Sequence, residues 1–210
     1  MLRDKYTTIA CLLVLFFGCG LVYSGTDGLR AFTAETARVN QLIEEKPTFP
    51  TVTFEDSEGR FYPISEFKDK YVFITFIYTS CTTVCPQLEM NMAQVYEKIP
   101  KEYIGEEIVF LSISFDPTRD DPQTLDKYKN YFGADGETWR MARITDPDEL
   151  QSLLDAFGVI VIPDGRGNFA HNSAFYIVDR DGGLLDVLDY QEIESAATKI
   201  TEILKQSKEE

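Results

Sequence analysis

An unbroken run of β-branched and aromatic residues, 72–78, leads directly into a helical pattern that begins near Pro86. A half-exposed strand would alternate polar and apolar residues, so this run predicts a central strand buried on both faces. The strand-to-helix turn contains Cys81 and Cys85. The amino end of a helix favours the anionic, reactive form of a thiol. The two cysteines are therefore the first candidates for chemistry.

The other patterns place this turn in an alternation of strands and helices. The predicted elements, in chain order, are a hairpin at 51–62, a strand at 72–78, a helix at 86–99, a strand at 108–115, two helices that begin near Pro122 and Pro147, strands at 175–178 and 184–188, and a helix at 193–204. This order predicts a thioredoxin-like α/β fold with an N-terminal hairpin extension. The dithiol turn follows the first central strand of that fold.

An apolar run, Ile9 to Val22, follows Arg3 and Lys5 near the start of the chain. It predicts one membrane anchor, with the N-terminus in the cytoplasm and the rest outside. Cleavage near Ser24, lipidation at Cys19 and a buried core helix are the alternatives. We expect an anchor at 1–24, a polar spacer at 25–47 and a folded domain at 48–207, on the outer side of a bacterial cytoplasmic membrane and facing the periplasm or the cell exterior.

The charge and the cysteine count narrow the classes of function. The chain has 35 acidic residues against 20 basic ones, for a net charge of −15, which repels phosphate backbones. No nucleic-acid partner is therefore expected. In the exported part only Cys81 and Cys85 remain, and one close pair does not make a disulfide scaffold. We interpret the pair as reactive.

The single histidine, His171, lies in a predicted loop before the strand at 175–178. In a thioredoxin-like fold the start of that strand faces the dithiol turn, where Asn172-Ser173 replaces the usual proline. Cysteines at i and i+4 on one helical turn face the same way. Two thiolates and an imidazole suit copper(I), whereas the thiols alone suit a redox disulfide. Zinc would need a fourth ligand that is not evident.

Three motifs together resemble the Sco (SenC) family. They are Cys-x3-Cys-Pro at 81–86, Asp-Pro-x-Arg-Asp at 116–120 and the histidine that opens the segment 171–182. The resemblance covers about residues 49–204. Members of this family are membrane-anchored, thioredoxin-like proteins that help assemble the dinuclear copper site of cytochrome c oxidase. The resemblance therefore implies a copper metallochaperone whose partner is the copper-receiving subunit of the oxidase or another copper protein.

Carried over residue by residue, the resemblance implies that a copper ion is bound by Cys81, Cys85 and His171. Asp116, Pro117 and Arg119 match a segment that shapes the site, with Asp116 as a hydrogen-bonding neighbour. Ala170 replaces an acidic residue that many members carry before the histidine, which puts a carboxylate behind the imidazole in doubt.

Other functions of the same residues stay open. If the chain is an enzyme, we expect a thiol:disulfide oxidoreductase that uses Cys81 and Cys85 as a redox-active pair to reduce the cysteines of a copper-binding partner. Thr82-x-x-Cys85-Pro86 also looks like a peroxiredoxin motif, but Tyr78 stands where that motif has a proline. A purely structural interaction domain would leave the two cysteines unexplained. The copper oxidation state and the oligomeric state do not follow from the sequence.

Overall fold

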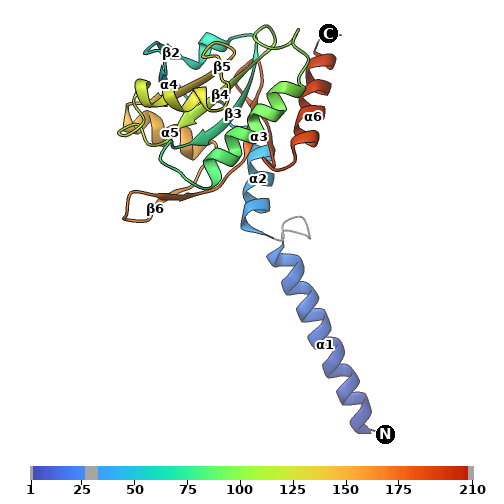
Figure 1. The fold of residues 1–210 in the computed structure, drawn as a ribbon. Coiled ribbons are helices and arrows are strands. Elements are labelled where there is room, and N and C mark those ends of the chain that lie inside the picture. The colour runs from blue at the N-terminus through green and yellow to red at the C-terminus, as the bar shows by residue number, and fades with distance from the viewer. Residues whose placement is uncertain (1, 27–32, 208–210) are drawn as a thin grey trace. The chain divides into compact units, whose positions relative to one another are not determined.

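The structure is a computed structural model that describes residues 2–26 and 33–207 (Figure 1). The chain forms two units, residues 1–44 and 45–210. The first contains helix α1, Leu2–Gly25, and helix α2, which is assigned to Ala34–Glu45. The predicted spacer at 25–47 therefore includes a helix that its polar composition did not predict. Residues 27–32 of that spacer lie outside the described part of the chain.

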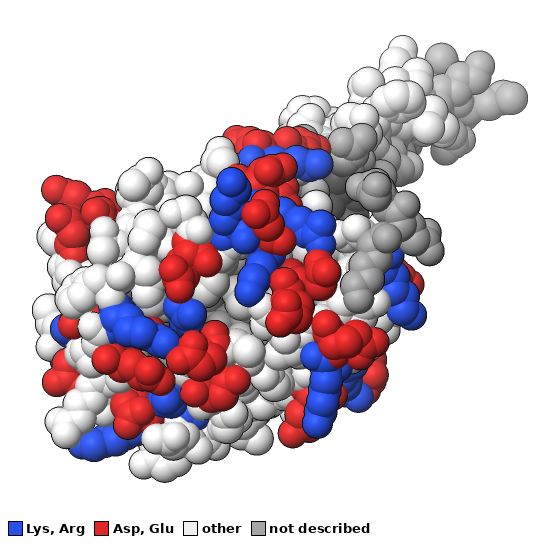
Figure 2. All heavy atoms as spheres, turned by 90° about the horizontal axis from the view of Figure 1, so that it is seen from above, with Lys and Arg blue, Asp and Glu red and all other residues white. Residues whose placement is uncertain are grey.

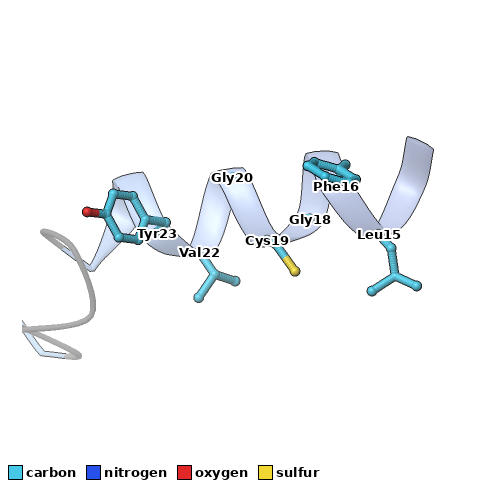
Figure 3. A pocket seen from close by; sticks show the side chains of 7 residues that line it. All are labelled: Leu15, Phe16, Gly18, Cys19, Gly20, Val22 and Tyr23. Atoms are coloured by element: carbon cyan, nitrogen blue, oxygen red, sulfur yellow. The ribbon is translucent and has the colours of Figure 1, made fainter. Parts of the chain in front are cut away.

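Helix α1 carries apolar side chains all round. Leu15, Cys19 and Val22 project from one side, while Phe16 and Tyr23 project from the other (Figure 3). Within the described residues it is the one helix long and apolar enough to cross a membrane, and its Tyr6–Gly25 segment is not buried against protein. Length and composition of this kind also fit a signal sequence.

The second unit is built on a seven-stranded sheet in the order β2-β1-β5-β4-β3-β8-β9. A second sheet of the described residues pairs β6 with β7 alone. The strands are β1 Thr53–Asp56, β2 Phe61–Pro63, β3 Tyr71–Ile77, β4 Ile108–Ser114, β5 Trp139–Ile144, β6 Val161–Pro163, β7 Phe169–His171, β8 Phe175–Val178 and β9 Leu184–Leu188. The helices are α3 Val84–Lys98, α4 Pro122–Asn130, α5 Pro147–Ala156 and α6 Ile193–Gln206, with a 3-10 turn at Ile64–Phe67.

The dithiol turn follows β3, a strand in the interior of the sheet. Strand β3 pairs in parallel with β4 and antiparallel with β8, and six of its seven residues are buried. The prediction of a central strand is confirmed. Tyr96 of α3 packs on Phe110 and Trp139, and Phe157 after α5 packs on Phe76 and Tyr176. Because Phe76 and Phe110 project from opposite faces of the sheet, helices cover both faces.

Aspartate-proline pairs begin two helices as predicted. The Asp121 side chain accepts the Thr124 N–H, and that of Asp146 accepts the N–H groups of Asp148 and Glu149. A proline follows each cap at the first helical position, where no N–H is needed. The turn at 179–183 also joins β8 to β9 in an antiparallel pair, as expected.

Three strands were not predicted. Strand β5 lies between α4 and α5, where two consecutive helices were expected, and it pairs with β4 and β1. Its Arg140 and Arg143 break the apolar pattern, but Arg140 stacks on Tyr62 and Phe67, while Arg143 pairs with Glu55 at 2.7 Å. Strands β6 and β7 form a short hairpin at 161–171 in place of the expected loop.

Charged side chains of both signs are intermixed on the face of the molecule in Figure 2. A few charged residues are nevertheless buried: like Asp56 and Asp120, Glu89 of α3 is fully buried. Neither carboxylate oxygen has a hydrogen-bond partner of ordinary geometry among the described residues. Burial raises the pKa of Glu89 to about 8. Near neutral pH the carboxyl is therefore largely protonated.

We predict that Glu89→Gln weakens the pH dependence of stability. A carboxyl whose pKa is raised on folding favours the folded state below its unfolded pKa, and that advantage is lost as pH rises toward the folded pKa. The wild-type free energy of unfolding should therefore fall by roughly 2–4 kcal/mol between about pH 4.5 and 8 on account of this group. Urea unfolding at several pH values measures it. Glu97→Gln, an exposed residue of the same helix, is the matched control, and equal pH slopes in the two variants would contradict the prediction.

Candidate metal centre

The two cysteines lie at the carboxyl end of β3, but only one is in the helix. Cys81 belongs to the turn, α3 begins at Val84, and Cys85 is its second residue. The prediction that both lie on one helical turn is therefore wrong. The reason is local: the Cys81 sulfur accepts the backbone N–H of Cys85 at 3.4 Å, so it serves as acceptor for an otherwise unpaired amide of the first turn.

The environment gives the two thiols different acidities. Burial alone would raise the pKa of Cys81, but the backbone N–H groups of Cys85 and Thr83 and the Thr83 hydroxyl lower it to about 7. Burial raises the pKa of Cys85 well above its ordinary value. Both side chains have little exposed surface. Cys81 is thus the readily ionised thiol, and Cys85 is the one whose ionisation needs a compensating charge.

His171 reaches this dithiol from a separate element. It is the last residue of β7, and its Nε2 lies 3.5 Å from the Cys85 sulfur. Its Nδ1 lies 2.9 Å from the carbonyl oxygen of Asn172. Because a carbonyl only accepts, Nδ1 carries the hydrogen and Nε2 keeps its lone pair toward the thiol. Burial also lowers the pKa of His171, which favours the neutral imidazole that can bind a metal.

Residue 170 is alanine, so it offers no carboxylate to the imidazole. The main-chain carbonyl of Asn172 accepts the Nδ1 hydrogen instead. Ala170 is exposed on β7. The Asn172 side chain accepts the Ile160 N–H at 2.7 Å and donates to the Gly158 carbonyl at 3.2 Å. The Asn172 carbonyl therefore orients the histidine, and the Asn172 side chain holds that backbone in place.

Asp116 does not act as the neighbour of the thiols or imidazole that was expected. Among the described residues its carboxylate accepts hydrogen bonds from Arg119 and Thr118. Arg119 in turn stacks over the rings of Tyr78 and Phe169, with its Cζ 5.9 and 5.5 Å from their centroids. The segment thus shapes the surroundings of the site through Arg119 and not through a direct bond from Asp116.

An aromatic cluster that sequence analysis did not single out surrounds the imidazole. The His171 ring centroid lies 5.0 Å from that of Phe115 and 6.2 Å from that of Tyr78. Phe169 packs edge-on against Tyr78 at 5.1 Å. Aromatic residues in or beside strands ordinarily indicate core, so no sequence signal distinguished these from the other buried rings.

The arrangement is a reduced dithiol with an imidazole beside one sulfur. Among the described residues no three side chains of the metal-binding types lie close enough together to enclose an ion as they stand. A metal bound by Cys81, Cys85 and His171 therefore requires a side-chain rotation that brings the three donors together. The donor set is soft, and two thiolates with an imidazole suit copper(I). The same two sulfurs, without the imidazole, suffice for a disulfide.

Comparison with known proteins points to one family. The SCO1/SenC family model matches residues 41–206. The SCO1 protein homolog of Bacillus subtilis is 30% identical over 145 residues, which cover 68% of this chain and 73% of that protein. The structure of Bradyrhizobium japonicum ScoI with copper bound is 25% identical, covers 74% of this chain and 98% of that one, and superposes with a TM-score of 0.61.

A third similar structure is that of BsSco, described as having a disulfide switch and as a member of the Sco family of cytochrome c oxidase assembly proteins. It is 24% identical, covers 73% of this chain and 95% of that one, and has a TM-score of 0.60. These likenesses confirm the predicted thioredoxin-like α/β fold.

We predict that alkylation distinguishes the two thiols. In the reduced protein Cys81 should react with iodoacetamide with a half-maximal rate near pH 7, because its thiolate is stabilised by the donors around it, while Cys85 should stay mostly unlabelled at that pH. Peptide mass spectrometry after timed labelling assigns each adduct. Cys81→Ser should abolish the fast neutral-pH labelling of this turn, and faster labelling of Cys85 than of Cys81 in the wild type would contradict the prediction.

Proposed function

This chain belongs to the SCO1/SenC family, and on that premise we propose that it is a copper metallochaperone. It binds copper through Cys81, Cys85 and His171 and delivers the ion to the dinuclear copper site of cytochrome c oxidase, or to another copper protein. Copper is the cargo here and not a resident cofactor. Two findings support this assignment: the similar ScoI of Bradyrhizobium japonicum has copper bound, and the family is involved in cytochrome c oxidase assembly.

The observation that carries the proposal is the approach of His171 to Cys85. Disulfide exchange needs only the two sulfurs, so it does not require an imidazole whose Nε2 lone pair lies 3.5 Å from one thiol. A metal ion uses that lone pair directly. On binding, each thiol loses its proton to solvent and contributes a thiolate, and the positive ion offsets the penalty of charging the buried Cys85.

A second function, thiol:disulfide oxidoreductase, is favoured by the unequal acidities of the thiols. The Cys81 thiolate would attack a partner disulfide to give a mixed disulfide, and Cys85 would then displace the partner's second thiol. The partner is reduced by two electrons, and the pair Cys81 and Cys85 is oxidised by two. This is the activity of a protein that keeps the cysteines of a copper-binding partner reduced.

Helix α1 supports the location proposed for this chemistry. We infer that it stays attached as a single membrane span and holds the folded unit on the outer side of a bacterial cytoplasmic membrane. Its length and its apolar side chains on every side suit a lipid environment. Arg3 and Lys5 before the span favour a cytoplasmic N-terminus.

We predict that His171→Ala separates the two functions. Removal of one of three ligands should lower copper(I) affinity roughly 100-fold or more, since the loss of a residue that only hydrogen-bonds to a ligand already costs about 10–100-fold in metal affinity. The Cys81 and Cys85 pair should still form and lose its disulfide. Competition with a chromophoric chelator measures the affinity, and thiol trapping measures the oxidation, in a Cys11→Ser, Cys19→Ser background that removes the other thiols.

The control for this comparison is Arg166→Ala at the exposed tip of the same hairpin. It should change neither measurement. Unchanged copper affinity in His171→Ala would mean that the imidazole is not a ligand and that the metallochaperone mechanism is wrong. Loss of disulfide formation in the same variant would instead show that the histidine serves the redox reaction.

We also predict that the natural protein keeps its N-terminal segment. Because no Ala-x-Ala triplet of the kind that marks a signal cleavage site closes the apolar run, mass spectrometry of the membrane-extracted protein should find α1 attached. A mature form that starts near Thr26, or one that starts at Cys19 with a lipid attached, would show cleavage or lipidation instead. Alkaline washing of membranes should leave the protein in the pellet.

A further inference from the structure

The hairpin of β6 and β7 has no strand pairing with the main sheet. Its two strands pair only with each other, in the register Val161 with His171 and Pro163 with Phe169. In Figure 1 it extends from the body of the second unit. The sheet that fixes both cysteines therefore does not fix His171. The imidazole is therefore positioned by the Asn172 carbonyl and by the contacts that hold the hairpin.

Different contacts hold the base and the outer part of the hairpin. Asn172 ties the base to Gly158 and Ile160 through two hydrogen bonds. Further out, the Phe169 N–H donates to the Tyr78 hydroxyl oxygen at 3.3 Å, and the two rings meet edge-on. Tyr78 directly follows β3 and lies three residues before Cys81, so this contact connects the hairpin to the dithiol turn.

Arg119 closes over this contact from a third element, the loop after β4. Its guanidinium lies over both the Tyr78 and the Phe169 rings, and its Nε donates to the buried Asp116. A Cβ added at Gly167 would lie 3.4 Å from Arg119 Nη1, so the guanidinium also rests against the hairpin backbone near its tip. Gly167 has a φ of +91°, which suits glycine at this close approach.

We propose that Arg119 is a positioning residue that clamps the hairpin and so holds His171 Nε2 beside the Cys85 sulfur. The clamp consists of Arg119, Asp116, Tyr78 and Phe169. Asp116 fixes the direction of the guanidinium, and the guanidinium fixes Phe169 on Tyr78. Since Phe169 and His171 are two residues apart on one strand, they lie on the same face, and the position of one determines that of the other. This inference rests on the proposed copper site.

A planar guanidinium is needed for this clamp. It can stack on two rings while its edge donates to a carboxylate, which an ammonium cannot do. Arg119→Lys should therefore keep the charge near Asp116 but lose most of the clamp. The chain also offers a matched control, because Arg140 stacks in the same manner on Tyr62 and Phe67, at 4.8 and 5.1 Å, away from the hairpin.

The test compares Arg119→Ala, Arg119→Lys and Arg140→Ala with the wild type, in the full chain with Cys11→Ser and Cys19→Ser. The first measurement is amide hydrogen exchange without copper. Both Arg119 variants should show about tenfold faster exchange in residues 161–171, with the central strands unchanged. Arg140→Ala should leave the hairpin as in the wild type. Equal hairpin exchange in Arg119→Ala and the wild type would overturn the clamp whether or not copper binds.

The second measurement is copper(I) affinity in a double-mutant cycle with His171→Ala. Arg119→Ala alone should weaken binding about tenfold, that is 1.4 kcal/mol. Added to His171→Ala it should weaken binding no further, because a positioning residue has no effect once the group that it positions is gone. Additive losses, or no loss from Arg119→Ala, would overturn the positioning role. If His171→Ala binds copper normally, the proposed copper site fails, and the exchange data still decide whether the clamp exists.

Should Arg119→Ala fold poorly, Phe169→Leu provides the second variant. It keeps an apolar contact on Tyr78 but removes the ring over which the guanidinium lies. It should reproduce the faster hairpin exchange and the roughly tenfold weaker copper binding. Wild-type behaviour in both measurements would overturn the proposal.

Discussion

The parallel pairing of β3 with β4 is the constraint on which the site depends. The two strands run in register over seven residues, from Tyr71 opposite Ile108 to Ile77 opposite Ser114. Their carboxyl ends therefore meet at one edge of the sheet. The dithiol turn leaves from one strand and the loop with Arg119 from the other. The Thr79 N–H, which donates to the Asp120 carboxylate at 3.0 Å, ties the turn to the loop.

Antiparallel pairing on the other side of β3 brings the histidine to the same edge. Strand β8 begins where β3 ends, and the Thr75 hydroxyl donates to the Ala174 carbonyl at 3.4 Å. The hairpin that precedes β8 must therefore lie near the dithiol turn, although His171 is 86 residues from Cys85 along the chain. Long-range pairing of a buried strand, and not local sequence, thus brings His171 near the two thiols.

This difference explains what the sequence predicts well and what it does not. Apolar runs predict the buried strands, and Asp-Pro pairs predict the capped helices that begin after Asp121 and Asp146. Strand β5 does not, because Arg140 and Arg143 interrupt its apolar pattern and are accommodated only by rings and carboxylates from distant segments. The i, i+4 spacing likewise suggested that both cysteines share one helical turn, but α3 begins at Val84, and the Cys81 sulfur accepts the Cys85 amide from outside the helix. The hairpin has too few residues for a period to be visible.

The thiols and the imidazole belong to different segments of the chain, and this separates the two chemistries that share the thiols. Cys81 and Cys85 lie between the end of β3 and the first turn of α3, so they can form a disulfide whatever the hairpin does. The proposed copper site needs the hairpin as well, because His171 is the last residue of β7. A disulfide removes both thiolate ligands, whereas a displaced hairpin removes only the imidazole. On the proposed mechanism, oxidation therefore abolishes copper binding, and loosening of the proposed clamp weakens it while the redox reaction continues. The affinity for copper would then be adjusted through Arg119 and Phe169, residues that touch neither sulfur.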